Sequence, residues 1–254
     1  MAKIALMGHI VASYPNLDSS LKAAVGIISG GAEYLEVQFP FSDPNADGET
    51  IANANAAALR DGFNTDSGFL FIKKLKKILD KEGLEAKLLI MTYGNILFNY
   101  GIKEFLLEAK KASVWGLIVP DLSIQNDECL FKLARKYGLQ NIALIAPNTP
   151  LKRIKQLCNT SGEIVYAVAR AGITGDKTII SNEILEYIKS IKEITKKPIA
   201  LGFGIQSKEQ IQALKGVVEI AVVGSAFVRK ITDLTATNGD FTKELECYTK
   251  ELLG

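Results

Sequence analysis

Short apolar runs alternate with longer amphipathic runs along the whole chain. The apolar runs are rich in β-branched residues and have the length of strands. They predict eight strands, over residues 4–12, 34–39, 88–93, 114–119, 142–146, 164–169, 198–202 and 219–223. Because these runs are almost continuously apolar, they favour a parallel sheet whose outer face is covered.

The amphipathic runs between the strands repeat with the period of a helix. They predict helices over residues 17–28, 102–111, 124–137, 183–194 and 208–214, among others. Eight successive strand–helix units predict an α/β protein folded as a (β/α)8 TIM barrel, with a single domain over residues 1–254. A doubly wound sheet is the rival fold, but the turn at MGHI, residues 7–10, lacks the glycines of a dinucleotide-binding turn.

Composition narrows the class of protein without changing the fold. With 48% hydrophobic and 23% charged residues, the chain can bury a large core and gives no sign of disorder. A net charge of +2 is too mild to indicate nucleic-acid binding, and the basic run 73–77 fits the exposed face of a helix. The first apolar run is too short for a membrane span and has no signal-peptide cleavage site after it.

The three cysteines, Cys129, Cys158 and Cys247, are odd in number and widely spaced. This pattern indicates neither a disulfide framework nor a zinc site. We therefore expect reduced thiols and a cytoplasmic protein.

Two acidic residues stand in contrasting surroundings around the end of the second predicted strand. Glu36 lies in the apolar run LEVQF, where burial favours the neutral carboxylic acid. Asp47 follows in a loop beside Gly48, where we expect it to stay ionised. Such a difference suits an acid and a base working together. The competing interpretation of Asp47 is a helix N-cap, because a helical pattern follows over residues 51–60.

Small residues end the last three predicted strands. The sixth strand runs into RAGITG at 170–175, the seventh into GFGI at 202–205 and the eighth into GSAF at 224–227. Late loops of a barrel commonly bind phosphate, and small residues let backbone N–H groups approach an oxyanion. Gly224 and Ser225 also open a helical run over 226–230, whose positive end suits an anion. The alternative is that these glycines only permit tight turns.

Two classes of chemistry, Schiff-base catalysis and metal catalysis, are disfavoured. The sixth strand, EIVYAVAR, has no lysine for a Schiff base, and a single histidine in the sequence is too few for a histidine metal cluster. Acid–base chemistry remains. That histidine, His9, is interpreted as a satisfied polar residue of the site wall rather than as a catalyst.

Five blocks of sequence carry a resemblance to a known family. They are PFSDP at 40–44 with ADG at 46–48, YGN at 93–95 with FN at 98–99, RAGITG at 170–175, GFGI at 202–205 and GSA at 224–226. In their order and spacing the chain resembles the alpha subunit of tryptophan synthase over nearly its whole length.

The resemblance implies cleavage of indole-3-glycerol phosphate to indole and glyceraldehyde 3-phosphate, a retro-aldol reaction of tryptophan biosynthesis that needs no cofactor in this chain. Glu36 and Asp47 match the family's catalytic acids. By this resemblance Glu36 protonates the indole ring at C3 and helps remove the glycerol hydroxyl proton, while Asp47 accepts a hydrogen bond from the indole N–H. Tyr166 matches a tyrosine near the reacting centre.

The same resemblance implies the binding residues. Thr174 would meet the aspartate when two loops close over the substrate. The residues expected to hold the phosphate are Gly175, Gly204, Gly224 and Ser225. Those expected to line the indole slot are Met91, Tyr93 and Phe203, because apolar and aromatic walls suit a flat ring.

A partner is implied as well, the pyridoxal-phosphate-bearing beta subunit in an alpha2beta2 complex. The contact surface would lie around Pro40, Asp43 and Asn95. Gln38 stands at a position that is commonly glycine and Ser123 at one that is usually proline, so both depart from the family pattern. His9 likewise stands where the family often has an apolar residue over the substrate.

Two other functions remain open. Another phosphosugar barrel enzyme, an isomerase or epimerase, would share the late phosphate loops but has no need of the loop that carries Asp47. A catalytically silent regulatory subunit would bind the phosphate ligand and only activate its partner. The presence of Glu36, Asp47 and Tyr166 together argues against a silent subunit.

Overall fold

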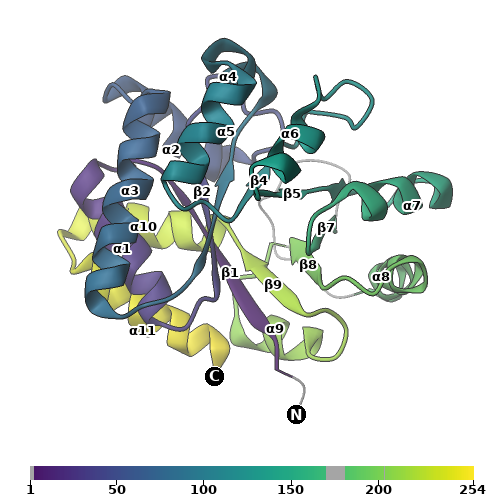
Figure 1. The fold of residues 1–254 in the computed structure, drawn as a ribbon. Coiled ribbons are helices and arrows are strands. Elements are labelled where there is room, and N and C mark those ends of the chain that lie inside the picture. The colour runs from purple at the N-terminus through teal and green to yellow at the C-terminus, as the bar shows by residue number, and fades with distance from the viewer. Residues whose placement is uncertain (1–2, 170–180, 203) are drawn as a thin grey trace.

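The computed structural model describes residues 3–169, 181–202 and 204–254. Within them, parallel strands form a sheet that is surrounded by helices (Figure 1). The strands are β1 (Ala5–Val11), β2 (Tyr34–Gln38), β3 (Lys87–Met91), β4 (Gly116–Ile118), β5 (Gln140–Ile142), β6 (Leu144–Ile145), β7 (Val165–Val168), β8 (Ile199–Gly202) and β9 (Ile220–Val223). The helices are α1 (Leu17–Ser29), α2 (Glu49–Arg60), α3 (Thr65–Glu82), α4 (Gly94–Tyr100), α5 (Ile102–Lys111), α6 (Leu130–Lys136), α7 (Leu151–Thr160), α8 (Asn182–Ile194), α9 (Lys208–Leu214), α10 (Ser225–Thr237) and α11 (Phe241–Leu253).

The sheet forms a barrel whose fifth strand is made in two pieces. The strand order β5-β4-β3-β2-β1-β9-β8-β7-β6 leaves β5 and β6 as its two ends. Ala143 alone separates these two strands in the sequence, and its carbonyl accepts the Tyr166 N–H at 3.0 Å. The Ser161 hydroxyl fixes the break, because it accepts the Ala143 N–H at 2.9 Å and donates to the Ile164 carbonyl at 2.5 Å. The predicted (β/α)8 barrel is confirmed, with the strand predicted over 142–146 divided between β5 and β6.

The helix predicted over 124–137 is wrong at its start, since α6 begins only at Leu130. Glu128 and Cys129 have φ values of 46° and 68°, a left-handed conformation that a continuous helix cannot contain. The Asp127 carboxylate accepts the Cys129 N–H at 3.2 Å and the Phe131 N–H at 2.8 Å. These local bonds offer the backbone an alternative to an earlier helical turn.

Side chains alternate along each strand between the barrel interior and the surrounding helices. In β1, Met7 belongs to the interior cluster, whereas Leu6 and Ile10 belong to the cluster between the sheet and the helices. His9 lies on the same side of β1 as Met7, because successive side chains point to opposite faces. Polar residues that share this face of a strand with Met7 therefore point into the barrel interior.

The N-terminal ends of the strands lie at the end of the barrel that is here called the barrel base and is defined by Tyr34, Lys87, Trp115 and Glu163. The Tyr34 and Trp115 rings meet edge to face with centroids 5.7 Å apart, and both pack against the interior cluster. The Lys87 Nζ lies 4.5 Å from the Trp115 ring centroid and 3.3 Å from Glu163 Oε2. The base therefore combines half-buried rings with charges that stay at the surface.

Candidate active site

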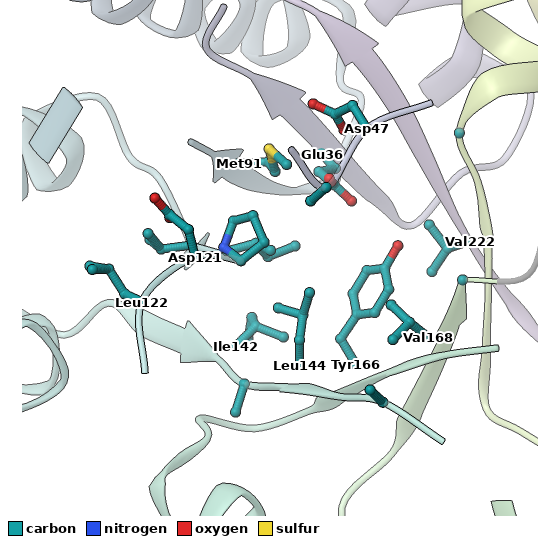
Figure 2. Close-up of a pocket in the computed structure, with 18 of the residues that line it drawn as sticks. Glu36, Asp47, Met91, Asp121, Leu122, Ile142, Leu144, Tyr166, Val168 and Val222 are labelled. Atoms are coloured by element: carbon teal, nitrogen blue, oxygen red, sulfur yellow. The ribbon is translucent and has the colours of Figure 1, made fainter. Parts of the chain in front are cut away.

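The opposite, carboxyl ends of the strands surround a cavity of about 630 Å³. Its lining includes the predicted site residues Glu36, Asp47, Met91, Tyr166, Gly204, Gly224 and Ser225. Figure 2 shows Glu36 and Asp47 across the cavity from an apolar floor that includes Ile142, Leu144 and Val168. Three other predicted residues, Thr174, Gly175 and Phe203, lie outside the described residues.

Glu36 reaches the cavity from the interior face of β2. Its side chain is buried, with 5% of the residue exposed. Oε1 lies 3.1 Å from His9 Nδ1 in the neighbouring strand β1. Oε2 has no hydrogen-bond partner among the described residues. One oxygen of the carboxyl group is thus held while the other remains for a ligand.

Asp47 lies in the loop between β2 and α2. The loop turns back at this point, since the Asp47 N–H donates to the Pro44 carbonyl at 2.9 Å. Gly48, not Asp47, occupies the N-cap position of α2, so the capping interpretation is wrong. The Asp47 carboxylate instead accepts Gln38 Nε2–H at 2.6 Å and the Tyr93 hydroxyl at 2.9 Å, both on Oδ2.

The surroundings of Asp47 differ from those of an ordinary loop carboxylate. Burial raises its pKa, while the hydrogen bond from Gln38, the charge of His9 and the hydrogen bond from Tyr93 act in the opposite direction, and the net shift is upward. The carboxylate is therefore a better proton acceptor than the sequence alone indicated.

Gln38 is a site residue that sequence reasoning treated only as a departure from the family pattern. It is completely buried, and its Nε2 donates to Asn55 Oδ1 at 3.3 Å as well as to Asp47. Asn55 is fixed in turn, because its Oδ1 accepts the Phe41 N–H at 3.1 Å and its Nδ2 donates to the Ile51 carbonyl at 2.8 Å. The signal was available, since Gln38 follows Glu36 by two positions and so shares its face of the strand.

Tyr93 contacts the site through its hydroxyl and not through its ring. The ring stacks on Phe41 with centroids 5.0 Å apart and is 1% exposed, and the residue does not line the cavity. Its hydroxyl accepts the Ala46 N–H at 3.1 Å and donates to Asp47. Burial, followed by the charge of Asp47, raises the pKa of Tyr93, so the phenol keeps the proton that it donates. Tyr93 was expected to line the indole slot, whereas in the structure its hydroxyl holds the Asp47 carboxylate.

Tyr166 enters the cavity from β7 with its hydroxyl directed toward the side where Glu36 lies (Figure 2). Burial, followed by the charges of Glu36 and Asp47, raises its pKa well above the ordinary value. A Cβ atom at Gly202 would lie 2.7 Å from the Tyr166 hydroxyl oxygen, so only glycine at the end of β8 accommodates this ring. Tyr166 is therefore held as a neutral phenol beside the two acids.

The expected phosphate-binding end lies where β8 and β9 finish. Gly204 has a φ of +69°, which favours glycine, and lines the cavity. Gly224 and Ser225 line it as well, and Ser225 is the first residue of α10, a helix of 13 residues. The N-terminus of a helix this long favours an anion through its dipole and its first N–H groups.

His9 differs from the satisfied wall residue that the sequence indicated. It is 4% exposed, and its Nε2 has no hydrogen-bond partner among the described residues. Burial lowers the pKa of His9, but the charge and hydrogen bond of Glu36, together with Asp47 and Gln38, raise it further, and the net shift is upward. The imidazole therefore interacts electrostatically with both Glu36 and Asp47.

A third carboxylate that lines the cavity, that of Asp121, is occupied by hydrogen bonds from the backbone. Asp121 accepts the Gly94 N–H on both oxygens, at 2.9 and 3.1 Å, and so caps the start of α4. Among the residues that the structure describes, no group of three or more His, Cys, Asp or Glu side chains is arranged to hold a metal ion.

Comparison with known proteins gives a consistent match over the whole chain. The family model described as tryptophan synthase alpha chain matches residues 1–253. The tryptophan synthase alpha chain of Helicobacter hepaticus is 49% identical over 254 residues, which cover 98% of this chain and 95% of that protein. The tryptophan synthase alpha chain of Methanocaldococcus jannaschii is 37% identical over 240 residues, which cover 94% of this chain and 84% of that protein.

Solved structures show the same similarity in three dimensions. A chain of the tryptophan synthase complex from Pyrococcus furiosus superposes with a TM-score of 0.88 at 30% identity, over 100% of both chains. A chain of tryptophan synthase from Mycobacterium tuberculosis superposes with a TM-score of 0.88 at 29% identity, over 99% of this chain and 91% of that chain.

Proposed function

Because the chain belongs to the tryptophan synthase alpha chain family, we propose that Glu36 and Asp47 are the two catalytic carboxylates of the family's reaction. That reaction cleaves indole-3-glycerol phosphate to indole and glyceraldehyde 3-phosphate, and the chain is a carbon–carbon lyase of tryptophan biosynthesis. The observation that carries the residue assignment is that both carboxylates line the same cavity. Glu36 reaches it from β2 and Asp47 from the loop that follows.

Glu36 acts as the general acid and then as the general base. Its Oε2, which has no partner among the described residues, supports this role, because a reacting group can approach that oxygen without displacing a bond from that part of the chain. Protonation at C3 of the indole ring makes the ring a leaving group. As the carbon–carbon bond breaks, the glycerol hydroxyl loses its proton to the carboxylate and becomes the aldehyde oxygen.

Asp47 accepts a hydrogen bond from the indole N–H as positive charge develops on the ring. The two hydrogen bonds that its carboxylate accepts from described residues both end on Oδ2, which supports Oδ1 as the oxygen that meets the substrate. Tyr166 lines the space between the acids and the apolar floor, where its neutral hydroxyl is suited to orient the substrate. Thr174 stays a prediction as the residue that meets Asp47 on loop closure.

The indole and phosphate ends of the substrate fit different parts of the cavity. Met91 and the apolar floor suit the flat ring, and Phe203 stays a prediction for the same wall. Gly204, Gly224 and Ser225 suit the phosphate, supported by the position of Ser225 at the start of α10. Gly175 stays a prediction for that end.

The partner of this chain is the beta subunit of tryptophan synthase, in an alpha2beta2 complex. We place pyridoxal phosphate in the beta subunit alone. We also propose that the contact surface includes Asp43 and Asn95, which are exposed, whereas Pro40 is buried and would support the surface from behind.

We propose a cytoplasmic location. The three cysteines support it, because all are free and two of them, Cys129 and Cys247, are exposed. None of the helices in the described ranges is long and apolar enough to cross a bilayer.

The decisive experiment measures indole release from indole-3-glycerol phosphate by the purified chain, alone and with the beta subunit. We expect release that rises when the partner is added. No release even with a competent partner would instead favour the silent subunit, or a phosphosugar isomerase or epimerase if such a substrate is turned over.

The phosphate end has its own test in Ser225→Asp. We expect the apparent KM to rise by at least about tenfold, because a carboxylate would repel the phosphate at close range. Ser225→Ala is the matched control and should raise the KM less, since it removes one hydrogen bond and adds no charge. An unchanged KM in Ser225→Asp would place the phosphate elsewhere.

A further inference from the structure

Two polar residues inside the barrel have no part in the reaction described above. In the register of β1 and β2, His9 stands opposite Glu36, and Val11 stands opposite Gln38. His9 and Gln38 are therefore near neighbours on the interior face, and they are only 4% and 0% exposed. Buried polar side chains in a core of this kind need hydrogen-bond partners.

Each of these residues makes a hydrogen bond to one of the two catalytic carboxylates. His9 Nδ1 lies 3.1 Å from Glu36 Oε1, and Gln38 Nε2 lies 2.6 Å from Asp47 Oδ2. Within the described part of the chain, His9 Nε2 and Gln38 Oε1 are both buried without a partner. A protonated imidazole donates from both nitrogens, and an amide oxygen only accepts, so the two unpaired atoms are complementary.

The charges around His9 favour its protonation. The acids that face it are Glu36 from β2 and Asp47 from the β2–α2 loop, and Tyr166 from β7 is neutral. The other charged groups of the cavity lining within the described ranges, Asp121 after β4 and Arg153 in α7, come from elements that do not adjoin β1. Glu36, Asp47 and Gln38 together outweigh the effect of burial, so the pKa of His9 is raised above its ordinary value of 6.5.

We propose that His9 is a positioning residue that stores the proton which Glu36 delivers to the indole ring, and that Gln38 links this pair to Asp47. The proposal rests on the lyase function proposed above. The geometry that carries it is a pair of buried contacts on neighbouring strands, His9 with Glu36 and Gln38 with Asp47. Among the described residues, the atoms left without a partner, His9 Nε2 and Gln38 Oε1, can act as a donor and an acceptor.

The proton inventory balances without a further reactant. His9 passes its Nδ1 proton to Glu36 Oε1, and a half-turn about the last bond of the Glu36 side chain, which has a broad torsional profile, presents that proton to the substrate. The proton adds to C3, the carbon–carbon bond breaks, and its electron pair restores the aromatic ring. The glycerol hydroxyl gives its proton to the Glu36 carboxylate, which returns it to His9 while the oxygen forms the carbonyl.

A test without turnover is possible because His9 is the only histidine in the sequence. The imidazole Cε1–H resonance of the full chain, followed by NMR against pH, reports His9 alone. We expect a midpoint above 6.5 in the wild type. In Glu36→Gln the midpoint should fall by about one pH unit or more, and in Gln38→Met by less. A wild-type midpoint at or below 6.5, or one unchanged in Glu36→Gln, would overturn the proposal.

The kinetic test compares His9→Gln with the wild type in the presence of the beta subunit. Glutamine can still donate to Glu36 but cannot hold a proton, so it would rescue a merely structural role. A carboxyl group ordinarily loses its proton at lower pH than an imidazole. We therefore expect the alkaline limb of the kcat profile to move about one pH unit or more toward acid, with KM changed less than kcat.

The two failures are distinguishable. Absence of indole release by the wild type would contradict the proposed function itself. Release by the wild type together with an unshifted kcat profile in a folded His9→Gln variant would overturn only the role of His9. If His9→Gln does not fold, the resonance titration of the wild type and of Glu36→Gln still decides.

Discussion

The two ends of the barrel use the same strands for opposite purposes. At the base, Tyr34 and Trp115 cover the interior and the charges of Lys87 and Glu163 remain in contact with water. The cavity end of the barrel, here called the mouth, is defined by His9, Glu36, Gln38 and Asp47. The side chains of His9, Glu36 and Gln38 are buried there, and each has one atom with no partner among the described residues. Buried polar groups without partners oppose folding, whereas apolar rings that pack against the interior favour it. The comparison indicates that the base stabilises the fold and the mouth supplies the chemistry.

The sharpest contrast is expected between two glutamates, one inside β2 and one just before it. Glu36→Gln should lower kcat by roughly 10²- to 10⁴-fold, the usual contribution of a general acid or base, while the fold survives. Glu33→Gln is the matched control, because Glu33 is exposed just before the strand and its side chain pairs with Lys3 at the surface. Steady-state indole release measures both. Near-normal turnover in Glu36→Gln would remove Glu36 from the mechanism.

At the base the larger effect should be on stability. Trp115→Ala removes a ring that packs on Tyr34 and lies under Lys87, and we expect the free energy of unfolding to fall by about 2–3 kcal/mol, less than for a fully buried tryptophan. Turnover at a temperature where the variant is folded should stay near that of the wild type. Trp115→Phe keeps an aromatic ring and should cost less. A large loss of kcat in folded Trp115→Ala would contradict the interpretation that the base contributes stability and the mouth contributes catalysis.

At the mouth, removing a charge should stabilise the protein. The pKa of Asp47 is raised above its ordinary 3.8 mainly by burial, so its contribution to stability is complete below pH 3.8 and is lost as the pH rises through the raised pKa. Asp47→Asn cannot ionise. At neutral pH we expect a gain of about 2–4 °C in the unfolding midpoint, as roughly 1 kcal/mol gives in a chain of this size, together with a loss of turnover.

The pH dependence identifies the cause of that gain. Thermal unfolding of Asp47→Asn and of the wild type should converge below pH 3.8, where both side chains are neutral. Asp61→Asn is the control, because Asp61 is exposed after α2 and should change neither stability nor turnover. A destabilised Asp47→Asn at neutral pH would show that the bonds from Gln38 and Tyr93 outweigh the burial of the charge.

The smallest effect is expected from the charge at the base. Lys87→Met keeps the apolar stem but removes the cation over Trp115 and the contact with Glu163, both partly exposed. We expect a loss of about 0.5–1 kcal/mol, measured by urea unfolding. Added salt should reduce the difference, since it screens the pair with Glu163. A loss that salt leaves unchanged would assign the effect to packing instead.

The apolar runs were sufficient to place the strands, because a strand covered on both faces needs no finer pattern. The same uniformity concealed which side chains point inward. The approach of His9 to Glu36 depends on the pairing of β1 with β2, which joins residues 27 positions apart. No local pattern encodes that register, so His9 was interpreted as a satisfied wall residue.

The sequence motifs predicted that Glu36, Asp47 and Tyr166 belong to one site, and the three residues do line one cavity. The motifs did not predict which side chains hold these residues in place. The structure assigns Tyr93 to the aspartate, through its hydroxyl, instead of to the cavity wall. The late start of α6 was missed for a related reason, since the left-handed residues Glu128 and Cys129 are not types that usually mark such a conformation.

The support of Asp47 has a consequence for the rate of cleavage. Gln38 and Tyr93 hold one carboxylate oxygen, and the same Tyr93 hydroxyl accepts the N–H of Ala46, so the carboxylate and its loop are ordered by the fold itself. The conformational entropy of this side chain is lost during folding and not when the substrate arrives. Less of the activation free energy of cleavage is then entropic, and the temperature dependence of kcat should reflect the chemical step.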